Sequence, residues 1–163
     1  SLPMSILRAV RARLLAIPGI TSLVLENAKP VPGYVRISIS DGSPTISNTL
    51  RDLVDIAMEE SAAAGIGYVL QLVDSVNTAV EVTIYSKNHN IAPLTFETNV
   101  TAALANLDSN LTLGNYLYLS AIIEACLITD VEDIKVNLPT ADVVVEASQL
   151  ASITTVKVNV VYI

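Results

Sequence analysis

The chain has 163 residues, of which 52% are hydrophobic and only 15% are charged. Such a composition argues against disorder, and no apolar run approaches the roughly 18 residues that a membrane-spanning helix needs. The net charge of −7 makes nucleic acid a poor partner, because phosphates repel an acidic surface. The mean hydropathy of +0.55 leaves two interpretations, an Ala- and Val-rich core or a surface partly covered by other molecules, and we favour the second.

The first half of the sequence predicts the order helix–strand–strand–helix–strand–strand. Apolar residues at steps of three and four mark the helices, and alternation of apolar and polar residues marks the strands. Pro18-Gly19 ends the first helix and Gly65 ends the second, since both residue types interrupt helical structure. The predicted elements are, in chain order, a helix over 5–17, strands over 20–26 and 34–40, a helix over 47–64, and strands over 67–75 and 78–86.

The second half begins after a polar connector, residues 87–93, and combines helices with further strands. Interleaved helices and hairpins predict an α+β fold of two small lobes, each with helices packed on one face of an antiparallel sheet. We expect residues 1–88 and 89–163 to form these lobes. The predicted elements of the second half are an extended piece over 93–97, helices over 98–107 and 116–127, and strands over 134–138, 143–145 and 154–163.

The sequence lacks the groups of residues on which enzyme and metal sites depend. His89 is the sole imidazole, whereas a zinc site takes three or four ligands. Asp130, Glu132 and Asp133 lie close together but match no calcium-binding loop, so a solvated turn is the simpler interpretation. Cys126 stands alone in an apolar helical pattern, without a second cysteine to pair with. We therefore predict no catalytic residue, no cofactor and no metal ion, and expect that the protein is not an enzyme.

Several short motifs, taken in order, resemble the baseplate J-like family, the wedge proteins of contractile phage tails and related injection machines. In the first half the matching residues are Ile17-Pro18-Gly19-Ile20, Glu26-Asn27 and Ala62-Ala63-Ala64-Gly65. In the second half, residues 111–139 are similar to the family's pattern through Gly114, Ser120 and Pro139. The sequence departs from that pattern at Thr129-Asp130-Val131, where the family has Gly-Val. Family members are usually longer, so the resemblance also implies that this chain is a fragment.

The resemblance implies a structural role in the baseplate of a phage or prophage tail, after assembly in the cytoplasm of the bacterial host. The implied partners are other baseplate and tail proteins and further copies of the chain, joined by protein–protein contacts. The main alternative is a peptide- or ligand-binding module that uses an exposed sheet edge, for which the final strand over 154–163 is the candidate. A cell-wall hydrolase is a weaker alternative, because it requires paired carboxylates or a metal site.

Two basic residues form our candidate contact face. Arg8 and Arg11 are three residues apart in the first predicted helix, so they lie on one polar face of it. We predict that this face meets an acidic neighbour in the assembled particle.

Overall fold

The computed structural model describes residues 2–43, 46–61, 67–71 and 73–163, which fall into two compact units. Unit 1 comprises residues 1–75, 112–114 and 146–150, and unit 2 comprises residues 76–111, 115–145 and 151–163. The backbone therefore passes from one unit to the other five times. This grouping differs from the two predicted lobes, 1–88 and 89–163, which stay a prediction about independently folding domains.

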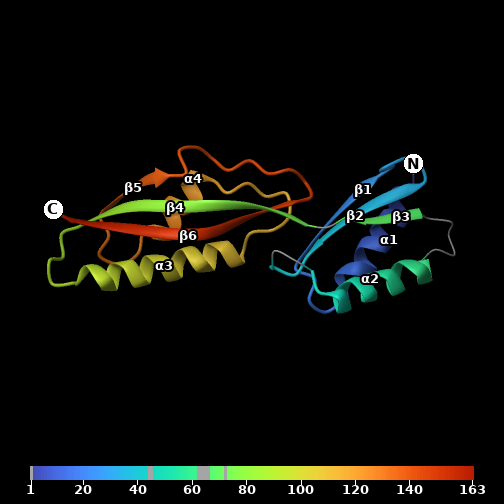
Figure 1. The fold of residues 1–163 in the computed structure, drawn as a ribbon, viewed down its shortest axis with the longest axis horizontal. Coiled ribbons are helices and arrows are strands. Elements are labelled where there is room, and N and C mark those ends of the chain that lie inside the picture. Colours follow the sequence, from blue (N-terminus) through green and yellow to red (C-terminus); the bar gives the residue numbers. More distant parts are fainter. Residues whose placement is uncertain (1, 44–45, 62–66, 72) are drawn as a thin grey trace. The chain divides into compact units, whose positions relative to one another are not determined.

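Unit 1 contains a three-stranded sheet, sheet A, and two helices (Figure 1). The strand order is β1-β2-β3, with β1 antiparallel to β2 and β3 parallel to β2. The α+β class is confirmed, but the sheet is mixed, because α2 crosses between β2 and β3 and returns the chain in the same direction. The elements are α1 (Met4–Leu15), β1 (Ser22–Asn27), β2 (Tyr34–Ser40), α2 (Asn48–Ser61) and β3 (Gly67–Gln71).

Both helices of unit 1 pack on the same face of sheet A. Alternate residues of a strand share a face, and Val35, Ile37 and Ile39 of β2 are all fully buried. They belong to one apolar core that also contains Val10 and Leu14 of α1 and, from α2, Leu50, Val54, Ala57 and Met58. This arrangement leaves the outer side of each helix free to face solvent or a partner.

Unit 2 contains a second three-stranded sheet, sheet B, in the order β5-β4-β6, and two further helices. Strand β5 is antiparallel to β4, whereas the arrows of β4 and β6 run in the same direction (Figure 1). The elements are β4 (Asp74–Ser86), α3 (Pro93–Ser109), α4 (Leu119–Cys126), β5 (Asp133–Leu138) and β6 (Gln149–Tyr162), and the first residues of β4 and β6 belong to unit 1.

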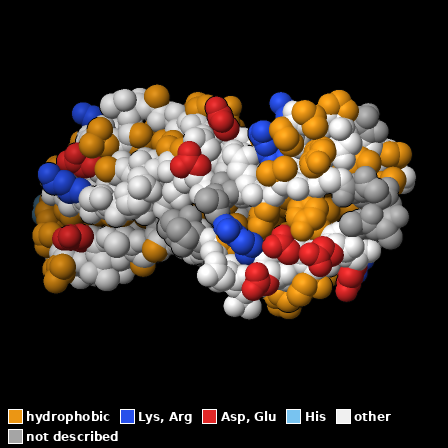
Figure 2. Space-filling model, turned by 45° about the vertical axis from the view of Figure 1, so that its right-hand side comes forward, with side chains coloured by type: hydrophobic (Ala, Val, Ile, Leu, Met, Phe, Trp, Pro, Cys, Tyr) orange, Lys and Arg blue, Asp and Glu red, His pale blue; other side chains and the backbone are white. Residues whose placement is uncertain are grey.

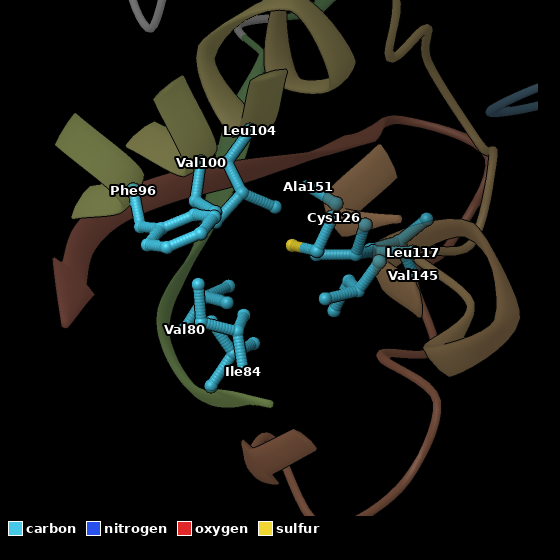
Figure 3. Close-up of a cluster of buried hydrophobic side chains, with 11 residues drawn as sticks. Val80, Ile84, Phe96, Val100, Leu104, Leu117, Cys126, Val145 and Ala151 are labelled. Atoms are coloured by element: carbon cyan, nitrogen blue, oxygen red, sulfur yellow. The ribbon is translucent and has the colours of Figure 1, made fainter. Parts of the chain in front are cut away.

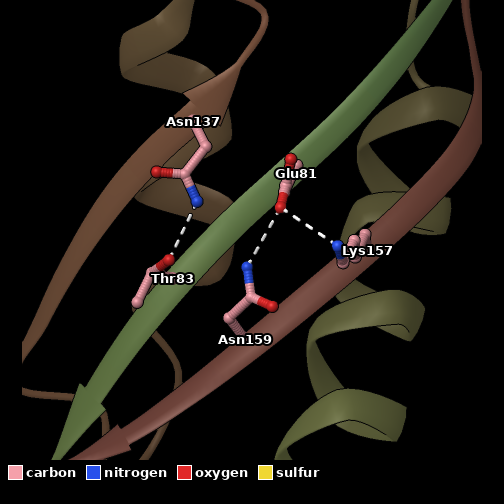
Figure 4. Close-up of polar contacts among 5 residues, drawn as sticks. All are labelled: Glu81, Thr83, Asn137, Lys157 and Asn159. Atoms are coloured by element: carbon pink, nitrogen blue, oxygen red, sulfur yellow. Dashed lines mark hydrogen bonds and ion pairs between the residues drawn. The ribbon is translucent and has the colours of Figure 1, made fainter.

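The two faces of sheet B differ in chemistry. On one face, Val80 and Ile84 of β4 meet Phe96 of α3 and Cys126 of α4 in an apolar core (Figure 3). On the other face, the Glu81 carboxylate accepts a hydrogen bond from the Asn159 amide at 3.2 Å and faces the Lys157 ammonium at 3.5 Å (Figure 4). Sheet B therefore carries its helices on one face and polar side chains on the other.

Three predicted boundaries in unit 2 need correction. Residues 93–97, predicted as extended, form the first turns of α3, because proline at the first helical position forgoes an N–H that has no helical partner. Helix α4 begins at Leu119 instead of residue 116, since Leu117 is extended and pairs with Val143. The predicted strand over 154–163 begins five residues earlier, at Gln149. The predicted end of the second helix at Gly65 lies outside the described residues.

Candidate functional site

Arg8 and Arg11 lie side by side on the exposed side of α1, as their spacing predicts. With Met4 and Leu7 of the same helix and Leu25 of β1, they line a groove of about 210 Å³. The Met4 side chain is 65% exposed, so the groove has an apolar part as well as a basic one. We call this surface the α1–β1 groove. It offers both charge and apolar contact to another molecule.

The two arginines differ in how they are held. The Arg11 guanidinium donates a hydrogen bond from Nη1 to the carbonyl oxygen of Leu23 at 3.2 Å, and Leu23 belongs to an edge strand of sheet A. Arg11 is thus tied to the backbone of an edge strand. Among the described residues, no carboxylate lies within ion-pair distance of Arg8 or Arg11, whereas Arg13 pairs with Glu60. The groove therefore presents positive charge that has no ion-pair partner in the described part of the chain.

The residues that carry the family resemblance in the first half have conformational roles where the structure describes them. Gly19 adopts a φ of +99°, a left-handed conformation that follows α1 and that glycine adopts at little cost. The Asn27 side chain accepts from the Leu2 N–H and donates to the Leu2 carbonyl, at 3.2 and 3.1 Å. Glu26 faces Arg36 at 3.8 Å. The third motif, residues 62–65, lies outside the described residues.

The second-half motif residues also shape the backbone. Gly114 adopts a φ of +74°, and its N–H donates to the carbonyl oxygen of Gln149 at 2.9 Å. A Cβ on Gly114 would lie 3.3 Å from the Ala147 backbone, a tight approach, so contact as well as conformation favours glycine there. Pro139 follows a cis peptide bond at the end of β5. These roles belong to a scaffold and not to a reaction centre.

The acidic residues near position 130 form part of the turn that precedes β5 and contacts the end of β4. Asp130 adopts a φ of +68°, and its carbonyl oxygen accepts the Ser86 hydroxyl at 2.7 Å. The N–H of Glu132 donates to the Tyr85 carbonyl at 2.8 Å. The described residues bring no three His, Cys, Asp or Glu side chains together in a way that could hold a metal ion. The structure thus gives this segment backbone contacts that join it to β4.

His89 and Cys126 occupy contrasting places in unit 2. The His89 ring is exposed, with Nε2 at 3.1 Å from the Ile163 carbonyl oxygen and its centroid 5.3 Å from that of Tyr162. Cys126 is fully buried in the core, and burial raises the pKa of its thiol to about 11. The thiol stays protonated at neutral pH and is therefore a weak nucleophile.

The final strand does lie at an edge of its sheet, as the alternative function requires. However, the Asp108 carboxylate of α3 accepts the Ile153 N–H of β6 at 2.7 Å, which occupies one of the backbone donors of that strand. Sequence reasoning missed the contact of Asp108, and it identified Asn27 as a motif residue without its contacts to Leu2. Each contact joins residues that are far apart in the chain, and no local pattern indicates such a pair.

The family model of the baseplate J-like protein C-terminal domain matches residues 78–159, which is half of the chain. The matched range includes Gly114, Ser120 and Pro139, on which the second part of the resemblance depends. Residues 1–77, with Arg8 and Arg11, lie outside it, so the first part of the resemblance stays a prediction. No curated protein sequence matches the chain.

Proposed function

Because this chain belongs to the baseplate J-like protein family, we propose that it is a wedge component of the baseplate of a contractile phage or prophage tail. The family is one of structural baseplate proteins, and the match over residues 78–159 is the observation that carries the proposal. The proposals of a wedge position and of a contractile tail rest on the motif resemblance along the whole sequence. In this role the protein works by being held between neighbours, without turning over a substrate.

The surface supports a role in assembly. Large apolar side chains are exposed on both units, and Figure 2 shows them at several places on one face, with carboxylates and basic side chains between them. Exposed apolar side chains that gather into patches with a polar rim are typical of surfaces that bind other proteins. None of the described helices combines the length and apolarity of a membrane crossing.

The proposed partners are other baseplate and tail proteins and further copies of this chain, brought together in the cytoplasm of the bacterial host. The α1–β1 groove is the proposed contact surface, through Arg8 and Arg11. We expect the double variant Arg8→Glu/Arg11→Glu to fold but to be absent from purified particles. The replacement of Arg11 also removes its hydrogen bond to the Leu23 carbonyl, so Arg8→Glu alone is the cleaner test.

The experiment for the proposed function is deletion of the full-length gene from the phage or prophage. We expect particles without complete baseplates, as seen by electron microscopy of negatively stained lysates, and recovery when the full-length gene is supplied in trans. The protein should then be detected in purified complemented particles by mass spectrometry. Complete baseplates in the deletion strain would contradict the proposal.

The edge position of β6 is the observation that favours the alternative, a module that binds extended peptides by strand addition. A peptide bound in this way would slow hydrogen exchange at β6 amides across residues 154–162. Failure of a panel of extended peptides to slow that exchange would leave assembly as the better explanation.

A further inference from the structure

We propose that the α1–β1 groove of one copy binds the outer side of helix α2 of a second copy. The inference rests on the proposed function in that it names one of the contacts from which the assembly is built. It joins two surfaces of the same chain whose chemistry is complementary. One is the groove lined by Met4, Leu7, Arg8, Arg11 and Leu25. The other is the α2 stripe, which we define as Asp52, Ile56 and Glu59.

The groove is basic at one part and apolar at the other. Arg8 and Arg11 have no carboxylate partner among the described residues, although the chain carries 16 acidic residues against nine basic ones. The hydrogen bond to the Leu23 carbonyl fixes Arg11 in place before any partner arrives. Less side-chain entropy is then lost on binding, which is the advantage of a preorganised contact.

The α2 stripe carries the opposite charge around an exposed apolar side chain. Ile56 is 53% exposed, and Asp52 and Glu59 lie about one helical turn before and after it. All three side chains are exposed, and the neighbouring Asp55, which is half-buried, accepts a hydrogen bond from the Tyr68 hydroxyl at 3.2 Å. The stripe is thus a carboxylate–apolar–carboxylate surface that the described contacts leave uncovered.

The spacings of the two surfaces agree. Leu7 and Arg11 are separated by about one helical turn along α1, as Ile56 and Glu59 are along α2. When Ile56 packs against Met4, Leu7 and Leu25, a neighbouring carboxylate of the stripe comes within reach of the long arginine side chains. A hydrogen-bonded pair of guanidinium and carboxylate forms there, at the side of an apolar contact.

The contact leaves the packing within each copy unchanged. Arg11 and Arg13 are two residues apart, so they point to roughly opposite sides of α1, and Arg13 pairs with Glu60 of α2 in the same copy. The groove is therefore on the side of α1 away from its own α2. Because the groove and the stripe are different surfaces, the contact is heterologous, and repeated copies close into a ring or extend as a filament.

The test is a charge swap in the full chain, followed by sedimentation velocity across a concentration series. We expect Arg8→Glu and Glu59→Arg each to weaken self-association about tenfold, and the double variant Arg8→Glu/Glu59→Arg to restore most of it. Lys87→Glu and Glu97→Arg make the same charge changes at exposed positions of unit 2 and should leave association unchanged. Circular dichroism checks that every variant is folded.

A cysteine pair gives an independent measurement. Leu7→Cys and Ile56→Cys are made in separate chains, so that a disulfide between the two positions forms only between copies. We expect oxidised mixtures to contain the linked dimer, identified by mass spectrometry of the joined peptides, and Leu7→Cys mixed with Glu97→Cys to lack it. The buried Cys126 does not compete, since its thiol is inaccessible.

The inference would be overturned if the chain stays monomeric throughout the concentration series. It would also be overturned if the double variant self-associates no more strongly than the two single variants. A third contradicting result is an Arg8→Glu variant that is absent from particles but self-associates as strongly as the unchanged chain, because the groove then binds a different protein. All three results leave the proposed function standing, since that is tested by gene deletion and complementation.

Discussion

Gly114 shows at the scale of one residue how the family motif is built into the backbone. Its φ of +74° is unfavourable for other residues, and a Cβ would lie 3.3 Å from the Ala147 backbone. Gly42 has a φ of +89° but would meet nothing within 4 Å, so it is a matched control. We predict that Gly42→Ala lowers the free energy of unfolding by about 1 kcal/mol and that Gly114→Ala lowers it by about 1 kcal/mol more. Urea titrations measure both, and equal losses would contradict the predicted contact.

A second prediction at the scale of one residue concerns the thiol of Cys126. Burial raises the pKa of the folded-state thiol from 9.0 to about 11, so the unfolded chain gives up this proton at lower pH than the folded chain does. The thiol therefore has no effect on the pH dependence below about pH 9, and it lowers stability as the pH rises from 9 to 11. The stability of Cys126→Ala should fall less steeply across that interval in urea titrations. A thiol reagent should label native protein far more slowly than unfolded protein at pH 8, and equal labelling rates would show that the thiol is accessible.

At the scale of elements, a hydrogen bond between a side chain of α3 and the backbone of β6 joins the helix to the strand. The Asp108 carboxylate accepts the Ile153 N–H at 2.7 Å, a hydrogen bond strengthened by the charge of its acceptor. We predict that Asp108→Ala lowers the free energy of unfolding by about 1.5–3 kcal/mol and speeds hydrogen exchange at the Ile153 amide. Asp108→Asn keeps a hydrogen-bond acceptor, so it should lower the free energy of unfolding by less than Asp108→Ala does. Unchanged exchange in the alanine variant would show that the bond is not formed in solution.

Elements with a strong local pattern could be predicted from the sequence. Strand β2 has the predicted bounds, 34–40, because alternating Val35, Ile37 and Ile39 leave no other periodicity. The parallel pairing of β3 with β2 could not be predicted, because element order alone does not fix which strands become neighbours. The prediction of an extended piece over 93–97 was wrong, because α3 begins at Pro93 and proline is well suited to the first turn of a helix.

The same limit applies to the candidate site. The spacing of Arg8 and Arg11 was enough to place them on one side of a helix. The rest of the site depends on where β1 packs against α1. This packing lets Leu25 complete the groove and lets the Leu23 carbonyl hold Arg11. These contacts join residues more than ten positions apart, and no local periodicity predicts them.

At the scale of the whole molecule, β4 determines where the chain divides. It is the central strand of sheet B and pairs with β5, although it comes before the predicted boundary near residue 88. We predict that the piece 76–163 unfolds cooperatively in urea, followed by far-UV circular dichroism, and that 89–163 does not, since it lacks this strand. Cooperative unfolding of both 1–88 and 89–163 would instead establish the two predicted lobes as domains.

The backbone passes between the units at residues 75–76, 111–112, 114–115, 145–146 and 150–151, which has a consequence for cleavage of the chain. Two units joined by a single tether separate once that tether is cut. Here any single cut between the units leaves four other covalent connections in place.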